Sequence, residues 1–351
     1  MNILHIADIA NEKGNGVAVA IKEYLKYEKK YCHVAIYNLN SNIAVDGVDS
    51  FSYTKFNSIN NLLKPYNRPD LVIFNEIYKK KFLKIYKECN KYNIPYVIIP
   101  HGSLVKRAQK KKWLKKFVAN VLLFNKFIKG AVAIQYLSRD EYNNSLKKNR
   151  SYIISGNGIE LVDVNNEYKS KSLIYIGRYD IKVKGLDLLI LMCSNHKKWF
   201  EDNDVKIKLY GRASGNLIEE LKKMITKNHV ENIIEINGEV YEEEKKEILR
   251  TAYSFIQVSR NEGQPMGVLE ALSYGIPCIL TYGTNFGEYV NKNKCGIGIP
   301  FDEDKLFEAI KKMIENESFR NTCSLNTKVA KEYNWDTVIK NCISEYQKLV
   351  K

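Results

Sequence analysis

The segment SLIYIGRYDIKVKGLDLLI, residues 172–190, contains the repeating unit from which the whole chain is built. It begins as a short apolar run, passes through a polar loop, and takes a helical pattern from about Gly185. Short apolar runs alternate with longer segments of helical period along the rest of the sequence. Continuous apolar strands separated by helices are typical of parallel sheets that are covered on both faces.

These apolar runs form two series. The first half contains NILHIA, HVAIYNL, DLVIFNE, IPYVIIP, AVAIQYL and SYIIS, and the second contains SLIYIG, VKIKLYG, IIEING, YSFIQVS, IPCILTY and CGIGIP. Two series predict an α/β protein with two doubly wound, Rossmann-like parallel-sheet domains. We expect the join within the polar residues 155–171, which gives domains 1–155 and 156–331.

Length and composition agree with a two-domain cytoplasmic protein. The chain has 351 residues, more than the roughly 250–300 at which a single core stops growing. No apolar run approaches the ~18 residues of a membrane span, and the first residues lack a secretion signal. The seven cysteines and five histidines are scattered, which predicts neither a disulfide framework nor a protein-held metal.

The excess positive charge lies in one half. Residues 1–155 contain 27 Lys and Arg against 11 Asp and Glu, whereas residues 156–351 contain 28 against 29. This asymmetry indicates that the first half faces a polyanion, either a nucleic acid or an anionic membrane surface.

The loops that follow the predicted strands carry the candidate binding residues, because ligands of open parallel sheets lie at the carboxyl ends of the strands. Gly14 and Gly16 precede a helix start that suits a phosphate, and Arg178 and Lys184 flank a loop that suits a diphosphate. His101 follows another strand and could bond a substrate hydroxyl. Taken singly, these residues could equally be a plain helix start, solvated cations and an ordinary histidine.

The stretch EGQPMGVLE, residues 262–270, has a carboxylate at each end. Gly263 permits close backbone approach and Pro265 suits the first turn of a helix, which places Glu270 about one turn into that helix. The two acids could be a working pair or, alone, a helix-start acid and a salt-bridge partner.

In order and spacing these loops resemble the family 4 (group 1) retaining glycosyltransferases, which have the two-Rossmann B-type fold. The resemblance covers nearly the whole chain through PHGSL, SGNGIE, GRYDIKVKG, LYGRASG, INGEV, the E-x7-E stretch and YNWDTVIKNCISEYQKLVK. It implies that residues 1–155 form an acceptor domain and residues 156–331 a donor domain, facing each other across a cleft. The terminal helix in residues 332–351 would return to pack on the first domain.

The resemblance also implies roles for the candidate residues. Glu262 and His101 would be catalytic, with Glu262 near the anomeric carbon and His101 on a sugar hydroxyl. The other donor-binding residues would be Arg178 and Lys184 on the diphosphate, Gly16 on a phosphate, Glu270 on the ribose, and Gly263 and Gln264 beside the sugar. Many family members have E-G-F-G at residues 262–265, where this chain has E-G-Q-P. Pro265 has no N–H to offer, so the sugar specificity is open.

The expected function is that of a hexosyl-type glycosyltransferase, which moves a sugar from a nucleotide diphosphate to a glycan or lipid-linked acceptor. The family implies retention of configuration, and we expect a UDP-sugar donor and a cell-surface product such as a capsule or O-antigen. No cofactor or metal is expected, because Asp202/Asp204 and Asp302/Asp304 lie outside the strand-end loops and read as solvated acids. One alternative is a nucleotide-sugar 2-epimerase of the same fold. The other is a nucleic-acid-binding protein, although the sequence contains no recognisable nucleic-acid-binding module.

The segment VKRAQKKKWLKKFVANVLLFNKFIKG, residues 105–130, could bring the protein to a membrane. Its lysines and Arg107 between Lys106 and Lys116 lie beside an apolar stripe of Trp113, Phe117, Val121, Phe124 and Ile128 at helical spacing. Such a helix can lie on anionic lipid, which predicts a peripheral attachment through Lys106–Lys116. We expect the stripe beyond residue 117 to face the core instead.

Overall fold

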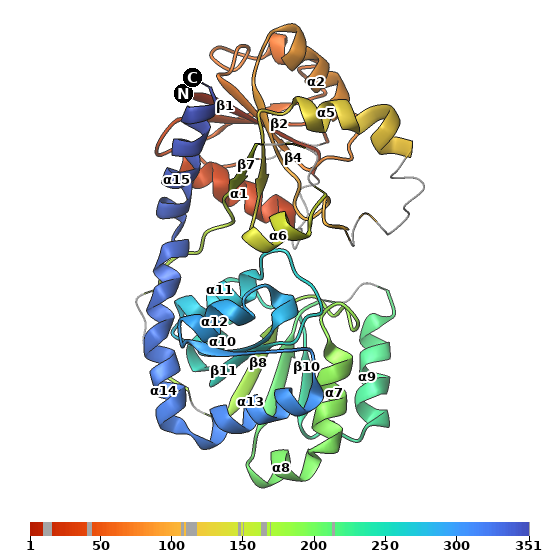
Figure 1. Ribbon diagram of the computed structural model, residues 1–351, viewed down its shortest axis with the longest axis vertical. Coiled ribbons are helices and arrows are strands. Elements are labelled where there is room, and N and C mark those ends of the chain that lie inside the picture. The colour runs from red at the N-terminus through yellow and green to blue at the C-terminus, as the bar shows by residue number, and fades with distance from the viewer. Residues whose placement is uncertain are drawn as a thin grey trace. The chain divides into compact units, whose positions relative to one another are not determined.

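The computed structural model describes residues 1–9, 16–40, 44–106, 109, 118–146, 149, 151–162, 167–168, 170–212 and 215–350. The chain divides into two compact units, Met1–Gly158 with Trp335–Lys351, and Ile159–Asn334. Each unit is built around one parallel sheet, as Figure 1 shows. Among the described residues, no helix has both the length and the apolarity to cross a bilayer.

The first unit contains a seven-stranded sheet of order β3-β2-β1-β4-β5-β6-β7. Its strands are β1 (Asn2–Ala7), β2 (His33–Asn38), β3 (Asp49–Ser52), β4 (Leu71–Asn75), β5 (Tyr96–Ile99), β6 (Ala133–Tyr136) and β7 (Tyr152–Ile154). Its helices include α1 (Gly16–Glu28), α2 (Phe82–Lys91), α5 (Asn125–Gly130), α6 (Arg139–Asn144) and α15 (Trp335–Leu349).

The second unit contains a six-stranded sheet of order β10-β9-β8-β11-β12-β13. The strands are β8 (Ser172–Ile176), β9 (Lys206–Tyr210), β10 (Ile234–Asn237), β11 (Ser254–Gln257), β12 (Cys278–Thr281) and β13 (Gly296–Ile299). The helices are α7 (Leu186–Asn195), α8 (Lys197–Asp202), α9 (Leu217–Lys227), α10 (Glu242–Thr251), α11 (Met266–Ser273), α12 (Gly287–Lys292), α13 (Glu303–Glu315) and α14 (Glu317–Asn326).

Both sheets are doubly wound. The central strands β1, β4, β5, β11 and β12 are buried almost throughout, and a separate apolar cluster covers each face of each sheet. Burial on both faces explains why these strands are continuous apolar runs rather than alternating ones. The predicted fold class, two Rossmann-like parallel sheets, is confirmed.

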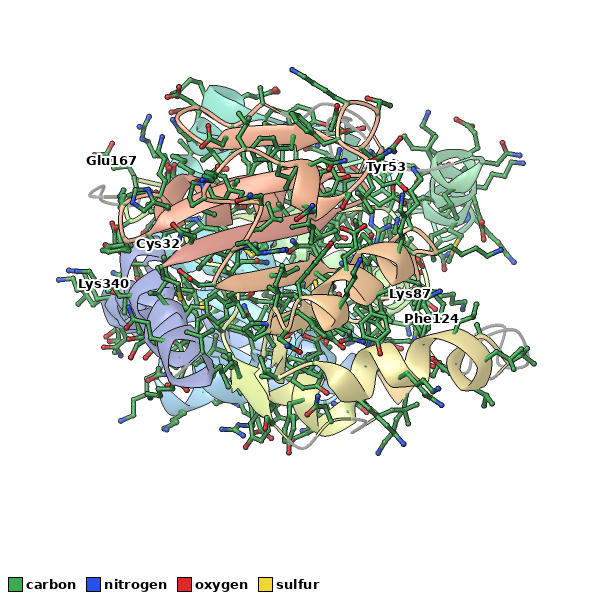
Figure 2. The ribbon with its side chains drawn as sticks, turned by 90° about the horizontal axis from the view of Figure 1, so that it is seen from above. Cys32, Tyr53, Lys87, Phe124, Glu167 and Lys340 are labelled. Atoms are coloured by element: carbon green, nitrogen blue, oxygen red, sulfur yellow. The ribbon has the colours of Figure 1, made fainter. Side chains whose placement is uncertain are left out.

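The carboxyl-terminal helix α15 packs on α1 within the first unit, as the sequence predicts (Figure 1). The Trp335 ring lies 5.3 Å from the Tyr24 ring and 5.5 Å from the Tyr27 ring, measured between centroids. On the outer side, Lys340 of α15 lies 5.5 Å from the Tyr31 ring, next to Cys32, and Figure 2 labels both Lys340 and Cys32. The end of the chain therefore stabilises the helix that follows the first strand.

The apolar stripe after residue 117 does not all face the core, which corrects the sequence-based expectation. Phe124, labelled in Figure 2, and Ile128 are buried, but Val121 is 56% exposed. A π-helical turn at Asn120–Phe124 changes the register of the side chains, so a regular helical spacing no longer applies there. Most of the basic segment before it, including Lys110–Phe117, lies outside the described residues.

Candidate functional site

The strand order of the second sheet identifies the place where a ligand is expected. The chain runs outward to one edge as β8, β9 and β10 and then returns to begin β11 on the other side of β8. The crevice at the carboxyl ends of two such strands is the usual ligand site of a doubly wound sheet. The loops at residues 177–185, after β8, and 258–265, after β11, meet at this point.

Gly185 allows these two loops to pack closely. Its φ is +69°, a left-handed conformation, and a Cβ there would lie 2.0 Å from the carbonyl oxygen of Val258. The Arg260 N–H donates to the Val183 carbonyl at 2.8 Å, so backbone joins backbone across the same gap. Only glycine meets both conditions, and α7 begins directly after it.

Lys184 and Glu262 join the two loops through their side chains. Lys184 Nζ lies 2.5 Å from Glu262 Oε1, and the side chains are 14% and 13% exposed. The same Oε1 accepts hydrogen bonds from Ser259 Oγ at 2.6 Å and Gln257 Nε2 at 2.8 Å. Because all three donors converge on Oε1, the carboxylate is fixed in direction and its Oε2 accepts none of these bonds.

Arg260 is a residue of this site that sequence reasoning missed. Its guanidinium donates two hydrogen bonds to the Asp187 carboxylate, at 2.7 and 3.0 Å, in the first turn of α7. Burial would raise the pKa of Asp187, but the hydrogen bonds from Arg260 and Lys182 outweigh burial and leave that pKa below its ordinary value. Arg260 therefore braces the loop that carries Glu262 against the helix that follows Lys184.

Arg178 differs from Lys184 in its surroundings. Its side chain is exposed at the start of the loop after β8 and forms no ion pair with any residue that the structure describes. The loop itself is anchored, because the Tyr175 hydroxyl donates to the Arg178 carbonyl at 2.8 Å. Arg178 thus presents a positive charge beside a fixed backbone, which suits an anionic ligand.

Glu270 lies on α11, and its Oε2 is 2.5 Å from Lys245 Nζ of α10. The two side chains are 30% and 27% exposed, so both can be reached from solvent. Glu270 does not contact Glu262 through any hydrogen bond, and the structure gives the two acids different partners. The pairing with Lys245 is the plain salt bridge that the sequence left open, and the unequal roles of the two acids stay a prediction.

The loop between these acids is held by Asn285, another residue that sequence reasoning missed. Its Nδ2 donates to the carbonyl oxygens of Glu262 at 2.7 Å and Gly263 at 3.2 Å. A Cβ on Gly263 would meet no atom of the described residues within 4 Å, so packing among them does not explain a glycine there, whereas close approach of a ligand would. Gln264 is half-buried, and Pro265 is buried directly before α11.

His101 belongs to the first unit and follows β5. Its φ is +46°, which is uncommon for a residue with a side chain. Its Nε2 is buried and has no hydrogen-bond partner among the described residues, and burial lowers the pKa of His101 to about 4. The imidazole is therefore neutral at pH 7, and Nε2 retains an unused donor or acceptor.

The remaining predicted site features are partly described. Helix α1 begins at Gly16, as expected, whereas Gly14 lies outside the described residues. Asp302 is the N-cap of α13 and accepts the Lys305 N–H at 2.9 Å, and Asp202 ends α8. Among the described residues, no group of three or more His, Cys, Asp or Glu is arranged to hold a metal ion.

Residues 160–330 match the protein family described as Glycosyl transferases group 1. This segment contains Arg178, Lys184, Glu262 and Glu270, so the family resemblance predicted from those motifs is confirmed. The match lies within the second unit and covers nearly all of it.

The chain is also similar to individual proteins. It is 22% identical over 183 residues to the GDP-mannose:cellobiosyl-diphosphopolyprenol alpha-mannosyltransferase of Xanthomonas oryzae pv. oryzae (strain PXO99A), which covers 50% of this chain and 46% of that protein. The match thus spans about half the length of that relative.

Two solved structures share the fold over almost the entire chain. Anabaena HepE in complex with UDP and glucose has a TM-score of 0.74 at 16% identity, covering 99% of this chain and 100% of HepE. The apo form of the lipopolysaccharide outer core galactosyltransferase WaaB has a TM-score of 0.68 at 16% identity, covering 99% of both chains.

Proposed function

We propose that this protein transfers a sugar from a nucleotide diphosphate to a glycan or lipid-linked acceptor. Its residues 160–330 match the group 1 glycosyl transferase family. The observation that carries the proposal is the pairing of Lys184 with Glu262 at the strand-order reversal of the second sheet. A cation and a directed carboxylate at this point suit a leaving diphosphate and a reacting sugar.

The donor diphosphate would bind Arg178 and Lys184, and the ribose hydroxyls would bind Glu270. The N–H of Gly16, at the start of α1, would face a phosphate. Charge favours this assignment, since Arg178 is exposed without an anionic partner among the described residues. A UDP-sugar is the donor we propose, and the HepE complex with UDP and glucose supports it by likeness of fold.

The reaction would separate charge, because positive charge grows on the anomeric carbon while negative charge grows on the departing phosphate oxygens. Arg178 and Lys184 would stabilise that phosphate as its charge develops, without a protein-held metal. Glu262 would lie beside the anomeric carbon and His101 would bond a sugar hydroxyl, with retention of configuration. Gly263, Gln264 and the N–H-less Pro265 would shape the sugar pocket.

The acceptor would be a glycan or lipid-linked precursor of a cell-surface polysaccharide, such as a capsule or O-antigen, and the first unit would bind it. Support comes from the names of similar proteins, which act on a diphosphopolyprenol-linked cellobiose and on the lipopolysaccharide outer core. The proposal places this activity in the cytoplasm, at the inner face of the membrane.

The experiment that tests the function is a thermal-stability panel of UDP, GDP and ADP and their sugars, followed by a transfer assay with EDTA present. A ligand at 100 times its Kd should raise the free energy of unfolding by about 2.7 kcal/mol. Stabilisation by one diphosphate and EDTA-resistant transfer to an acceptor would support the proposal. Epimerised donor without transfer would replace it by a 2-epimerase, and salt-sensitive nucleic-acid binding without nucleotide binding would refute it.

The variants Glu262→Gln and Glu270→Gln should lose transferase activity through different kinetic parameters. Glu270→Gln should mainly raise the donor KM, because a ribose contact is present in the ground state and in the transition state alike. Glu262→Gln should mainly lower kcat, because the fixed carboxylate acts where charge develops. Steady-state kinetics on both variants measure this difference, and the same kinetic pattern in both would refute the division of roles.

Peripheral attachment to an anionic membrane is a second part of the proposal. Next to the basic Lys106–Lys116 segment, the structure exposes four neighbouring apolar side chains: Val118 (51%), Val121 (56%), Leu122 (73%) and Leu123 (43%). Lys126 and Lys129 on α5 are exposed directly after them. Apolar side chains flanked by lysines suit an acidic bilayer, which attracts each nearby cation by about 1 kcal/mol.

The attachment should respond to charge. Wild type should sediment with vesicles of acidic phospholipid, weakly at high salt, and hardly at all with neutral vesicles. Changing Lys110, Lys111, Lys112 and Lys115 together to glutamine should reduce sedimentation and leave nucleotide binding intact. Equal sedimentation of both proteins on acidic vesicles would show that these lysines are only a solvated face.

A further inference from the structure

Glu141 is a buried carboxylate that bridges two loops of the first unit. The residue is 1% exposed. Its Oε1 accepts the Gly102 N–H at 2.6 Å, and its Oε2 accepts the Leu137 N–H at 2.7 Å. Gly102 follows β5 and Leu137 follows β6, which are neighbouring strands. One side chain thus joins the loops that follow the carboxyl ends of β5 and β6, and His101 lies in the first of these loops.

The local sequence alone would give Glu141 a different partner. Ser138 is the N-cap of α6, and its Oγ accepts the Glu141 N–H at 3.0 Å. In a capping box the acid three residues later returns to the N–H of the N-cap residue. Here the carboxylate instead reaches past Ser138 to Leu137 and across to Gly102, so Ser138 alone caps the helix and Glu141 serves another loop.

The position is unfavourable for a carboxylate. Burial raises the pKa of Glu141, although the two backbone N–H groups oppose that effect. No cation among the described residues forms an ion pair with it. Burying a carboxylate costs free energy of folding unless hydrogen bonds or a partner charge compensate it, so the Gly102 and Leu137 N–H groups are what stabilises Glu141 in this position.

The Gly102 bond holds a turn in which two successive residues have positive φ. His101 has a φ of +46° and Gly102 a φ of +78°, and the Ser103 N–H closes the turn on the Pro100 carbonyl at 3.0 Å. A left-handed conformation is strained for a residue with a side chain, because its Cβ approaches the following carbonyl oxygen. Without the bond from Glu141, His101 would relax toward a conformation that moves its imidazole.

We propose that Glu141 is a positioning residue of the transferase: by holding the Gly102 N–H, it fixes His101 for its hydrogen bond to a sugar hydroxyl. The inference rests on the proposed function, because it assigns Glu141 to the same reaction. Glu141 itself touches no substrate and acts only through the turn.

The first test compares Glu141→Gln with Ser138→Ala. A glutamine offers one oxygen for two N–H donors and presents an NH₂ to the other, so one bond is lost. We expect kcat to fall about 10- to 100-fold, as for a misplaced catalytic group, with a small change in donor KM. Ser138→Ala weakens the start of the same helix without touching Gly102 and should change kcat less than about twofold.

A double-mutant cycle with His101→Ala separates positioning from general loosening. If Glu141 acts through His101, Glu141→Gln should have little further effect on kcat once the imidazole is gone. An equal fold-loss in both backgrounds, or wild-type kcat in Glu141→Gln, would overturn the proposal.

A second variant and a measurement without substrate cover the remaining outcomes. Gly102→Ala keeps the carboxylate but strains the turn, and it should lower kcat only when His101 is present. Amide hydrogen exchange at Gly102 should speed up in Glu141→Gln and not in Ser138→Ala, whatever reaction the protein catalyses. Unchanged amide exchange at Gly102 in Glu141→Gln would show that Glu141 does not hold the Gly102 N–H, and would overturn the proposal. Faster exchange in a protein that has no transfer activity would count only against the proposed function. Loss of folding in Glu141→Gln, with Gly102→Ala fully active, would show a purely structural role.

Discussion

Lys184→Ala is expected to lower kcat/KM for sugar transfer by about 100- to 1,000-fold, the loss typical of removing one stabilising group from an anionic transition state. The reason is twofold in this site. The ammonium would hold the departing diphosphate, and its bond to Glu262 Oε1 at 2.5 Å sets the direction of that carboxylate. One substitution therefore removes a phosphate contact and releases the acid beside the sugar.

Lys182 provides the matched control, because it lies two residues earlier in the same loop. Its side chain is 79% exposed and pairs with Asp187 at 2.8 Å, so Lys182→Ala removes a solvated cation and should change kcat/KM less than about twofold. Titration with a nucleoside diphosphate and with the nucleoside alone completes the test. Lys184→Ala should weaken only the diphosphate, and equal losses for both ligands would contradict the assignment of Lys184 to the phosphates.

The sequence was sufficient for most of the fold because the buried strands are continuous apolar runs. Among the strands in the described part of the chain, the one it missed is β3, Asp49–Ser52, a short edge strand in which only Phe51 is buried. An edge strand of this composition is formed by its pairing with β2 and has no apolar run of its own. The exposure of Val121 was also missed, because regular helical spacing in the sequence does not reveal a π-helical turn.

The candidate site divides in the same way. Motif spacing identified Lys184 and Glu262 separately, but their contact joins residues 78 positions apart and depends on the adjacency of β8 and β11. Arg260 and Asn285 belong to no recognisable sequence motif. Each stabilises a loop by hydrogen bonds to residues that are distant in the sequence. Glu141 did carry a local signal, the S-x-x-E of residues 138–141, yet that pattern predicts a helix start and not a bond to Gly102.

The largest expected effect on stability comes from a buried pair in the first unit. His5→Leu should lower the free energy of unfolding by about 3–5 kcal/mol, because it leaves a buried acid without its donor. His5 on β1 and Glu28 at the end of α1 are both fully buried, with Nε2 and Oε2 2.7 Å apart. Glu28 Oε1 has no hydrogen-bond partner among the described residues, so His5 is the side-chain contact that compensates this carboxyl group.

The neighbours of His5 define how the pair is built and how to test it. Asn75 Nδ2 donates to the Ile6 carbonyl and lies 3.3 Å from His5 Nδ1, which makes Nδ1 the acceptor and Nε2 the donor to Glu28.

If the loss of stability in His5→Leu arises from the unpaired buried carboxyl group of Glu28, adding Glu28→Met should restore much of the stability, because paired apolar replacements of buried polar groups are often neutral. Urea unfolding of the wild type, His5→Leu and the double variant measures this. A double variant less stable than His5→Leu would mean that packing of α1 on β1, and not the acid, sets the loss. Since α1 begins at Gly16, the proposed phosphate contact, the same variants also reveal whether donor binding depends on a pair at the other end of that helix.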